Sequence, residues 1–281
     1  MKLRIATCTT LPEVDVDAAP LASALAAAGF AAEIVAWDDP AADWDAPIPT
    51  VIRSTWNYAL DVTRFLAWVD RASAAAPLIN PPSIVRGNVH KRYLLELAAR
   101  GVAVVPTILV ERGGAHDRSH DLAPLAESRM VIKPAVGAGS LGTRVFEPGD
   151  PDALAHLGTL TATGAALVQP YVRSVDGYGE RSLVWIDGAL SHAIRKSPRF
   201  AGDVERIDGP FPIADDERDL AEAALAPFRD LLYGRVDLAR DDAGQPMVME
   251  LELVEPSLFF ARQPGSAERY AAGLRRRLAS S

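Results

Sequence analysis

The segment that decides the fold is Met249-Glu250-Leu251-Glu252-Leu253, in which apolar and acidic side chains alternate. Successive side chains of a strand point to opposite faces, so Glu250 and Glu252 share one face. The segment Arg235-Val236-Asp237-Leu238 alternates as well, which predicts a neighbouring strand with Asp237 beside the two glutamates. Three carboxylates on one face repel each other unless a cation lies among them, and oxygen ligands suit Mg²⁺. The pattern predicts a magnesium site; an exposed acidic face is the simpler alternative.

A lysine and a glycine-rich loop lie upstream of these strands. Lys133 ends the apolar run Val131-Ile132-Lys133-Pro134, where a lysine needs a partner or a ligand, and the loop Gly137 to Thr143 follows. Backbone N–H groups of such a loop can fold over phosphates. Lys91 lies in the first turn of a predicted helix, where the helix dipole disfavours a cation. Each feature alone also fits a surface lysine or a hairpin loop, but together with the metal site they indicate a bound nucleoside triphosphate.

Two familiar glycine motifs do not fit this loop. Gly137, Gly139 and Gly142 spell G-x-G-x-x-G, but a dinucleotide-binding turn continues directly into a helix. Here Thr143–Phe146 is β-branched and aromatic, which favours a strand. A P-loop would need Lys-Ser/Thr where Thr143-Arg144 stands. What remains is a flexible loop between two strands.

The composition predicts a globular cytoplasmic protein. The chain has 281 residues, 49% of them hydrophobic, and a formal net charge of −8, which does not favour a nucleic-acid partner. Its single cysteine, Cys8, excludes an intramolecular disulfide and fits a reducing compartment. The sequence contains no run of about 18 apolar residues, so no membrane helix is predicted. The segment from Met1 to Cys8 is too short and too strand-like for the apolar region of a signal peptide. The oligomeric state is left open, and a homo-oligomer is compatible with the sequence.

Strands and helices alternate over about the first 85 residues, which predicts a small parallel α/β unit. From residue 181 onward the pattern is rich in strands, with Asp187-Gly188 as a hairpin turn. Besides the two acidic segments, the expected strands are 3–8, 32–37, 50–53, 103–105, 107–110, 130–133, 144–146, 166–169, 182–186 and 189–195. The expected helices are 21–28, 61–76, 88–101 with Asn88 as its cap, 152–157, 215–232 and 266–278.

The order of these parts resembles the ATP-grasp superfamily, the fold of glutathione synthetase, D-alanine–D-alanine ligase and ribosomal-protein glutamate ligases. The resemblance covers nearly the whole chain. It implies an α/β (α+β) fold with a small N-terminal parallel α/β domain and two α+β lobes that enclose ATP. The implied domains are a substrate-side domain over 1–87, a central lobe with the glycine loop over 88–172, and a C-terminal lobe with the metal site over 173–281.

Carried over residue by residue, the resemblance implies a role for each matching position. ATP would be held by the phosphate-binding Lys91 and Lys133, by the loop residues Gly137, Gly139, Ser140 and Gly142, and by the adenine-side segment Gln169, Tyr171 and Val172. Arg181 and Lys196 would be catalytic cations that face the triphosphate and the acyl phosphate. The Mg²⁺ ligands would be Asp237, Glu250 and Glu252. Family members usually have asparagine where Glu252 stands, but a third carboxylate still suits magnesium.

A narrower similarity links the chain to the branch that contains the D-cycloserine-forming cyclo-ligase, an enzyme that uses ATP to close O-ureido-D-serine into a ring. The segments that carry it are Cys8-Thr9-Thr10-Leu11-Pro12, Arg53-Ser54-Thr55-Trp56-Asn57-Tyr58, Ser191-His192-Ala193 and Leu253-Val254-Glu255-Pro256-Ser257. This similarity implies a role in antibiotic biosynthesis.

The superfamily implies acyl-phosphate chemistry on a small, amino-acid-like carboxylate. The carboxylate attacks the γ-phosphate of ATP, and an amine, in a cyclo-ligase one within the same molecule, then takes the acyl group. Arg53 is the candidate for gripping the substrate carboxylate, because it follows an apolar strand at its C-terminal end; a structural salt bridge is an equally good interpretation. A kinase on the same fold and a non-catalytic nucleotide-binding module are the alternative functions.

Overall fold

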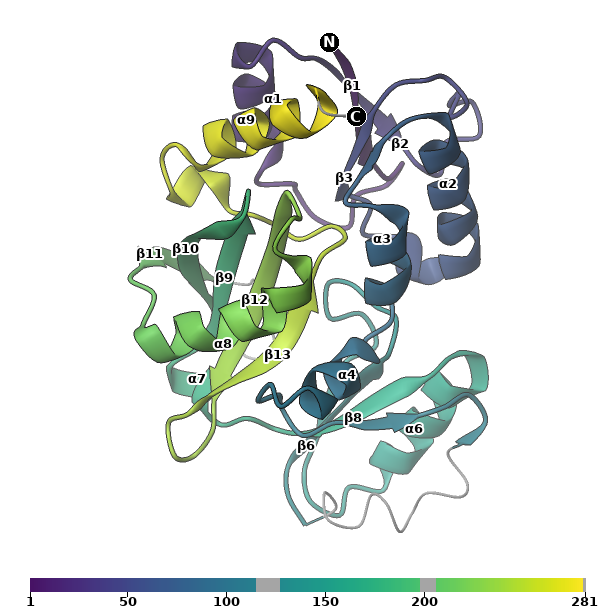
Figure 1. Cartoon of the computed structure of the whole chain (residues 1–281). Coiled ribbons are helices and arrows are strands. Elements are labelled where there is room, and N and C mark those ends of the chain that lie inside the picture. Colours follow the sequence, from purple (N-terminus) through teal and green to yellow (C-terminus); the bar gives the residue numbers. More distant parts are fainter. Residues whose placement is uncertain (115–126, 198–205, 280–281) are drawn as a thin grey trace.

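Three β-sheets, each built from a different part of the chain, form the framework of the protein (Figure 1). The computed structural model describes residues 1–114, 127–197 and 206–279. One sheet is parallel and two are antiparallel, with helices packed against them. This arrangement confirms the predicted α/β (α+β) class.

The N-terminal sheet is parallel, as its alternating strands and helices predicted. Its strand order is β2-β1-β3-β4. The central strand β3 is buried along its whole length, because a helix packs on each face. The elements are β1 (Lys2–Thr7), α1 (Ala18–Ala27), β2 (Ala31–Ala36), β3 (Thr50–Ser54), α2 (Val62–Ala75) and β4 (Leu78–Ile79).

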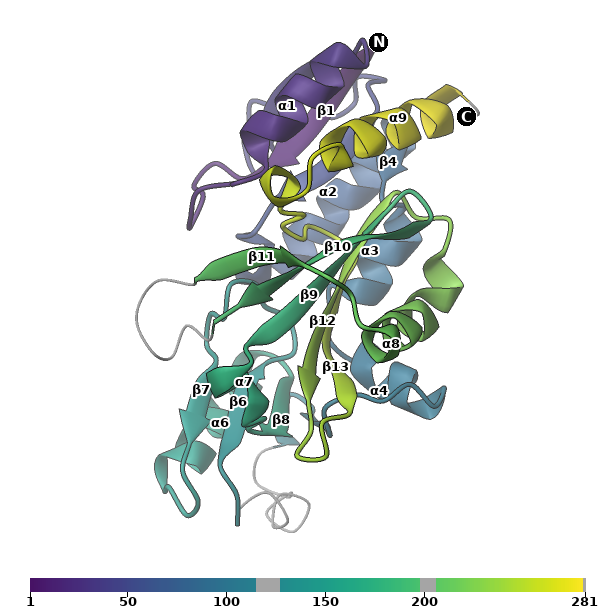
Figure 2. The same ribbon diagram turned by 90° about the vertical axis from the view of Figure 1, so that its left-hand side faces the viewer.

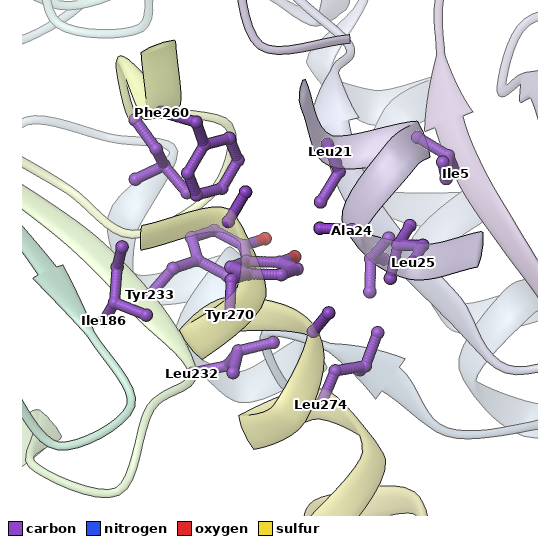
Figure 3. Close-up of a cluster of buried hydrophobic side chains, with 14 of the residues drawn as sticks. Ile5, Leu21, Ala24, Leu25, Ile186, Leu232, Tyr233, Phe260, Tyr270 and Leu274 are labelled. Atoms are coloured by element: carbon purple, nitrogen blue, oxygen red, sulfur yellow. The ribbon is translucent and has the colours of Figure 1, made fainter. Parts of the chain in front are cut away.

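The last helix of the chain, α9 (Ser266–Ala279), lies beside α1 on one face of the N-terminal sheet (Figures 1 and 2). Tyr270 and Leu274 of α9 belong to the same buried cluster as Leu21 and Leu25 of α1 (Figure 3). The end of the chain therefore completes the hydrophobic core of its beginning, so the two ends of the sequence are packed as one unit.

The central sheet is antiparallel and has the order β5-β8-β6-β7. The glycine loop joins β6 to β7, and α6 packs its Leu157 against Ile132 and Val168 of the sheet. The helix is longer than the predicted 152–157. The elements are β5 (Ile108–Val110), β6 (Met130–Pro134), β7 (Arg144–Phe146), α6 (Asp152–Thr163) and β8 (Ala166–Pro170).

The C-terminal sheet is antiparallel with the order β11-β10-β9-β12-β13, and α8 covers one of its faces (Figure 2). The hairpin between β9 and β10 turns at Asp187-Gly188, as predicted; both residues have positive φ, 49° and 83°. The elements are α7 (Ser174–Gly177), β9 (Glu180–Ile186), β10 (Ala189–Lys196), β11 (Ile207–Phe211), α8 (Asp215–Leu225), β12 (Tyr233–Arg240) and β13 (Pro246–Glu252). Short 3₁₀ helices are η1 (Tyr58–Leu60), η4 (Ala226–Phe228) and η5 (Phe260–Arg262).

The predicted helix capped by Asn88 was wrong. Instead α3 (Pro82–Asn88) ends at Asn88 and α4 (Tyr93–Ala99) begins after a break. The Asn88 side chain does not cap a helix, because its amide donates to the carbonyl of Leu251 (2.9 Å) and its oxygen accepts from the N–H of Leu253 (2.7 Å). Lys91 lies in the break, where its N–H donates to the carbonyl of Ala135 (2.7 Å). Contacts with both antiparallel sheets therefore replace the continuous helix.

Two other expectations also differ from the structure. The helix predicted over 215–232 ends at Leu225 and continues only as η4, which contains Pro227, a residue that lacks the N–H a longer helix needs. The strand predicted over 103–105 is a single bridge between Val104 and Val248.

Candidate active site

A cavity of about 760 Å³ is lined by residues of all three sheet units. The N-terminal unit contributes two loops, the central sheet the glycine loop and the end of β8, and the C-terminal sheet the acids of β13 with the segment that follows. Of the residues proposed from the sequence, those that line the cavity are Lys91, Lys133, Gly137, Gly139, Ser140, Gln169, Tyr171, Val172, Lys196, Glu250 and Glu252.

The three acids of the predicted metal site lie together. Asp237 pairs with Glu250 across β12 and β13, and one carboxylate oxygen from each of Asp237, Glu250 and Glu252 lies within 4.8 Å of the others. Val236 and Leu251 face α8 on the opposite side of the same strands. The alternation of each strand thus places the three acids on one face, where Glu250 and Glu252 line the cavity, whereas Asp237 is fully buried and is not among the lining residues. Three clustered oxygen ligands match what Mg²⁺ prefers.

Protein cations compensate these acids in part. Arg235 donates to both oxygens of Asp237 (2.8 and 2.9 Å) and to Glu252 (2.5 Å). Lys196 donates to Asp237 (2.8 Å) and also pairs with Glu180. Despite Arg235, burial raises the pKa of Glu252 to about 7. A divalent cation beside this carboxylate would hold it ionised, so the donor set fits a metal ion.

Two lysines of the segment 88–172 face the acids. Lys91 pairs with Glu250 and donates to the carbonyl of Gly137 (3.1 Å). Burial alone would raise the pKa of Glu250, but Lys91 and Lys133 outweigh it and hold the pKa at about 2. Among the described residues no ion pair or hydrogen bond is found for the Lys133 ammonium, and burial lowers its pKa. Lys133 is therefore a cation on the cavity wall that has no ion-pair or hydrogen-bond partner in the described ranges.

The glycine loop lines the cavity except at Gly142. Gly139 and Ser140 adopt positive φ, 60° and 62°, which turns the loop along the cavity wall. Gly142 points elsewhere: its carbonyl contacts the ring of His156 (2.9 Å), and a Cβ there would lie 2.9 Å from Pro134 Cγ. Gly142 is thus needed for close packing of the loop against β6, and it does not line the cavity as the sequence suggested.

The end of β8 and the segment after it form another wall through Gln169, Tyr171 and Val172. Gln169 donates to the Thr107 hydroxyl (2.8 Å), and the Tyr171 N–H donates to the carbonyl of Arg129 (2.8 Å). The segment is therefore fixed from outside the cavity, and its inner side is left to a ligand.

Arg53 does not reach the cavity, contrary to its predicted contact with a substrate carboxylate. It is buried in an ion pair with Asp17 (3.1 Å), and the two side chains are 1% and 0% exposed. Asp17 in turn accepts from the N–H groups of Leu258, Phe259 and Phe260 (2.5, 3.2 and 2.8 Å). Of the two interpretations of Arg53, the structural salt bridge is the one that fits. Arg53 affects the cavity only indirectly, through the chain segment that Asp17 anchors.

Arg181 also lies away from the cavity. It pairs with Glu217 of α8 (3.1 Å) and donates to the carbonyl of Pro212 (2.7 Å). It stands opposite Leu238, which faces α8, whereas the preceding Glu180 stands opposite Lys196 and lines the cavity. Neighbours along a strand face opposite sides, which is why Arg181 cannot share the cavity with Glu180.

Several cavity residues had not been identified from the sequence. Arg235 had a visible signal, because alternation puts it on the same face as Asp237. Glu255 follows β13 in a segment without periodicity and was visible only within a segment that carried the family resemblance; burial and the charge of Glu252 raise its pKa to about 8. The N-terminal wall, which includes Thr9, Trp56, Asn57 and Tyr58, was visible only as part of a family resemblance.

Known proteins share this architecture. Residues 3–80 match the family described as D-cycloserine synthetase DcsG, N-terminal domain. Cycloserine biosynthesis protein DcsG of Streptomyces lavendulae is 38% identical over 294 residues, which cover 98% of this chain and 97% of that protein. A crystal structure of D-cycloserine synthetase DcsG superimposes with a TM-score of 0.90 at 35% identity and covers 99% of this chain and 100% of that chain.

A more distant similarity concerns the fold alone. D-alanine–D-alanine ligase from Bacillus anthracis has a TM-score of 0.73 at 16% identity, with complete coverage of both chains. None of the helices in the described ranges has the length and apolar character needed to cross a membrane. Because a relative matches at 38% identity over almost the full length of both proteins, the chain belongs to the DcsG family, and its fold is that of the ATP-grasp ligases.

Proposed function

We propose that this enzyme uses ATP to close O-ureido-D-serine into the ring of D-cycloserine. The observation that carries the proposal is one cavity whose wall combines Lys91 and Lys133 with Glu250 and Glu252, which cluster with the buried Asp237. The similarity to DcsG over the whole chain supports this choice of substrate.

In this proposal the chain's own residues bind and orient ATP. Lys91 and Lys133 hold its phosphates, the glycine loop folds over them with backbone N–H groups, and the segment from Gln169 to Val172 borders the adenine. Lys133 needs no rearrangement to do so, because its ammonium is not engaged within the described parts of the chain. When bound at the three acids, Mg²⁺ supplies charge neutralisation at the transferring phosphoryl group.

The substrate carboxylate attacks the γ-phosphate of ATP, and ADP leaves. The acyl phosphate that forms has phosphate as its leaving group, which departs far more readily than the oxygen of a free carboxylate. The nitrogen bonded to the side-chain oxygen of the substrate then attacks the acyl carbon, phosphate leaves, and the ring closes. Water removes the remaining carbamoyl group as CO₂ and ammonia, which balances the atoms. Lys196, on the cavity wall between Glu180 and Asp237, is placed to offset negative charge that develops in these steps.

The three parts of the chain are assigned complementary roles. Residues 1–87 would bind the substrate side, 88–172 would carry the glycine loop, and 173–281 would carry the metal site. Each part contributes one sheet, although α9 packs with α1 on the first. Dependence on ATP and the free Cys8 thiol support a cytoplasmic location.

The test is to incubate the purified protein with O-ureido-D-serine, ATP and Mg²⁺ and to measure ADP and D-cycloserine. Both should form without an added amine, and ¹⁸O from the substrate carboxylate should appear in the released phosphate. O-ureido-L-serine is the matched control for substrate recognition. A stable phosphate ester without isotope transfer would replace the ligase with a kinase, and a strict need for a second amine substrate would exclude cyclisation.

A further inference from the structure

The acids of the cavity wall differ in whether the protein neutralises them. Three form ion pairs with cations of the chain: Glu180 with Lys196, Glu250 with Lys91, and Glu252 with Arg235. Glu255 lines the same cavity, is 9% exposed, and has no ion-pair partner among the described residues. Tyr58, whose hydroxyl is a neutral group, lines the cavity with it. The cavity therefore contains a carboxylate that forms no ion pair within the parts of the chain that the structure describes.

The backbone around Glu255 is held in place by side chains from two sheet units. Trp56 Nε1 donates to the carbonyl of Glu255 (3.1 Å), and the Tyr233 hydroxyl donates to the carbonyl of Val254 (2.8 Å). Arg235 Nη1 donates to the carbonyl of Ser257 (3.1 Å). This segment is anchored independently of any ligand, so the carboxylate is preorganised.

Ionising a buried carboxylate that has no ion-pair partner is unfavourable, and a cationic ligand group would offset this cost. The metal ion is not that cation, because the acid cluster comprises Asp237, Glu250 and Glu252 and does not include Glu255. Glu255 follows Glu252 by three residues, and three residues of extended chain span at most about 10 Å. One small molecule can thus place a carboxylate near the metal acids and a cation at Glu255.

We propose that Glu255 binds the α-ammonium group of the substrate, with Tyr58 beside it, and so makes the enzyme specific for amino acids over their desamino counterparts. This inference rests on the proposed function, because it assumes that the carboxylate of the same molecule is activated at the acid cluster. An ammonium group has three donors, which can reach the carboxylate and neighbouring oxygens together. The pairing also orients the substrate, since it fixes both ends of the α-carbon.

The test is steady-state kinetics of Glu255→Gln with O-ureido-D-serine. Loss of one charge-assisted hydrogen bond should raise KM for this substrate about 10- to 100-fold and leave KM for ATP unchanged. Glu255→Asp should recover part of the affinity. Glu222→Gln, an exposed position on α8, is the matched control and should behave like the wild type. A fall in kcat at unchanged KM would overturn the proposal, because it would make Glu255 a proton acceptor rather than a binding group.

Calorimetry separates this inference from the proposed function. The wild type with ADP and Mg²⁺ is titrated with two pairs of probes: O-ureido-D-serine and 3-(ureidooxy)propanoate, and D-alanine and propionate. Tighter binding of the amine in either pair, lost in Glu255→Gln, supports the ammonium site even if no D-cycloserine forms. Equal affinity within both pairs overturns the ammonium site even if D-cycloserine does form. Thermal melting of the variant verifies that it is folded.

Discussion

Arg53 and Asp17 form an ion pair that is sealed inside the protein, with Nη2 3.1 Å from Oδ2. The pair joins β3 to the loop before α1, and Asp17 also accepts three backbone N–H groups from Leu258 to Phe260. This segment continues the one that holds Glu255, so a contact buried behind the cavity fixes the cavity wall. Arg53 is in this sense a positioning residue for the active site.

The first prediction is that Asp17→Ala is strongly destabilising. The change leaves Arg53 as a buried charge without its carboxylate, which typically costs about 3–5 kcal/mol of unfolding free energy. Urea denaturation of the variant measures this loss. Asp45→Ala, which breaks the exposed pair with Arg71, is the control and should change stability little. A stable Asp17→Ala protein would mean that the buried pair contributes little to the fold.

The second prediction concerns Lys133→Ala. Because this ammonium has no partner within the described ranges, its removal should leave the melting temperature unchanged and weaken ATP binding about 10- to 100-fold. Calorimetric titration with a non-hydrolysable ATP analogue measures the affinity. Lys2→Ala, on an exposed residue, is the matched control. Unchanged nucleotide affinity would remove Lys133 from the phosphate site.

The third prediction is that Glu250→Gln lowers kcat by about 100-fold or more, because a charged metal ligand contributes several kcal/mol to stabilising the transferring phosphoryl group. The variant should also need a higher Mg²⁺ concentration for half-maximal ADP release. Near wild-type ADP release would contradict the metal assignment of this strand face. Glu222→Gln serves again as the exposed control.

The fourth prediction separates the two cations that the sequence had grouped together. Arg181→Met should lower the free energy of unfolding by about 3–5 kcal/mol, since it removes the close ion-pair partner of the buried Glu217. It should leave KM for ATP unchanged. Lys196→Met removes a cation from the cavity wall and should lower kcat in the folded protein. The test is to measure the unfolding free energies and the kinetic constants of both variants. A raised KM for ATP in Arg181→Met would show that Arg181 does contribute to the ATP site.

Strand alternation explains how much of the site could be predicted from the sequence. It placed Asp237, Glu250 and Glu252 on one face, and the structure confirms their clustering. The same rule shows why two adjacent residues of one strand, Glu180 and Arg181, cannot both face the cavity. The prediction for Arg181 relied on family resemblance and did not apply that rule.

Long-range contacts account for what the sequence could not predict. Arg53 and Asp17 are 36 positions apart, and nothing in either local pattern reveals their pairing. Asn88 was a good helix cap by propensity, but it bonds to Leu251 and Leu253, more than 160 positions away. Glu255 lies in a segment with no periodicity, so only the folded chain shows that it lines the cavity.

The last prediction uses Cys8 as a reporter of the N-terminal cavity wall. The Cys8 thiol is buried and donates to the carbonyl of Thr10 (3.3 Å), and burial raises its pKa. The adjacent Thr9 is held by Asp38, which accepts from its N–H and its hydroxyl (both 2.8 Å) and from Asn57 (2.7 Å). Thiol labelling at pH 8 should therefore be slow in the native protein and faster in Asp38→Ala.

The pKa of Asp38 determines the pH range in which its carboxylate stabilises this part of the fold. Burial opposes ionisation of Asp38, but hydrogen bonds from Thr9 and Asn57 lower its pKa. A lowered folded-state pKa gives stability that is fully present above the unfolded value of about 3.9 and is lost as the pH falls through the folded value. At pH 8 the contribution of Asp38 is complete, so Asp38→Ala should label Cys8 about tenfold faster or more, and should raise KM for the carboxylate substrate while KM for ATP stays constant. Labelling at the wild-type rate would show that Asp38 does not hold this part of the cavity wall in place.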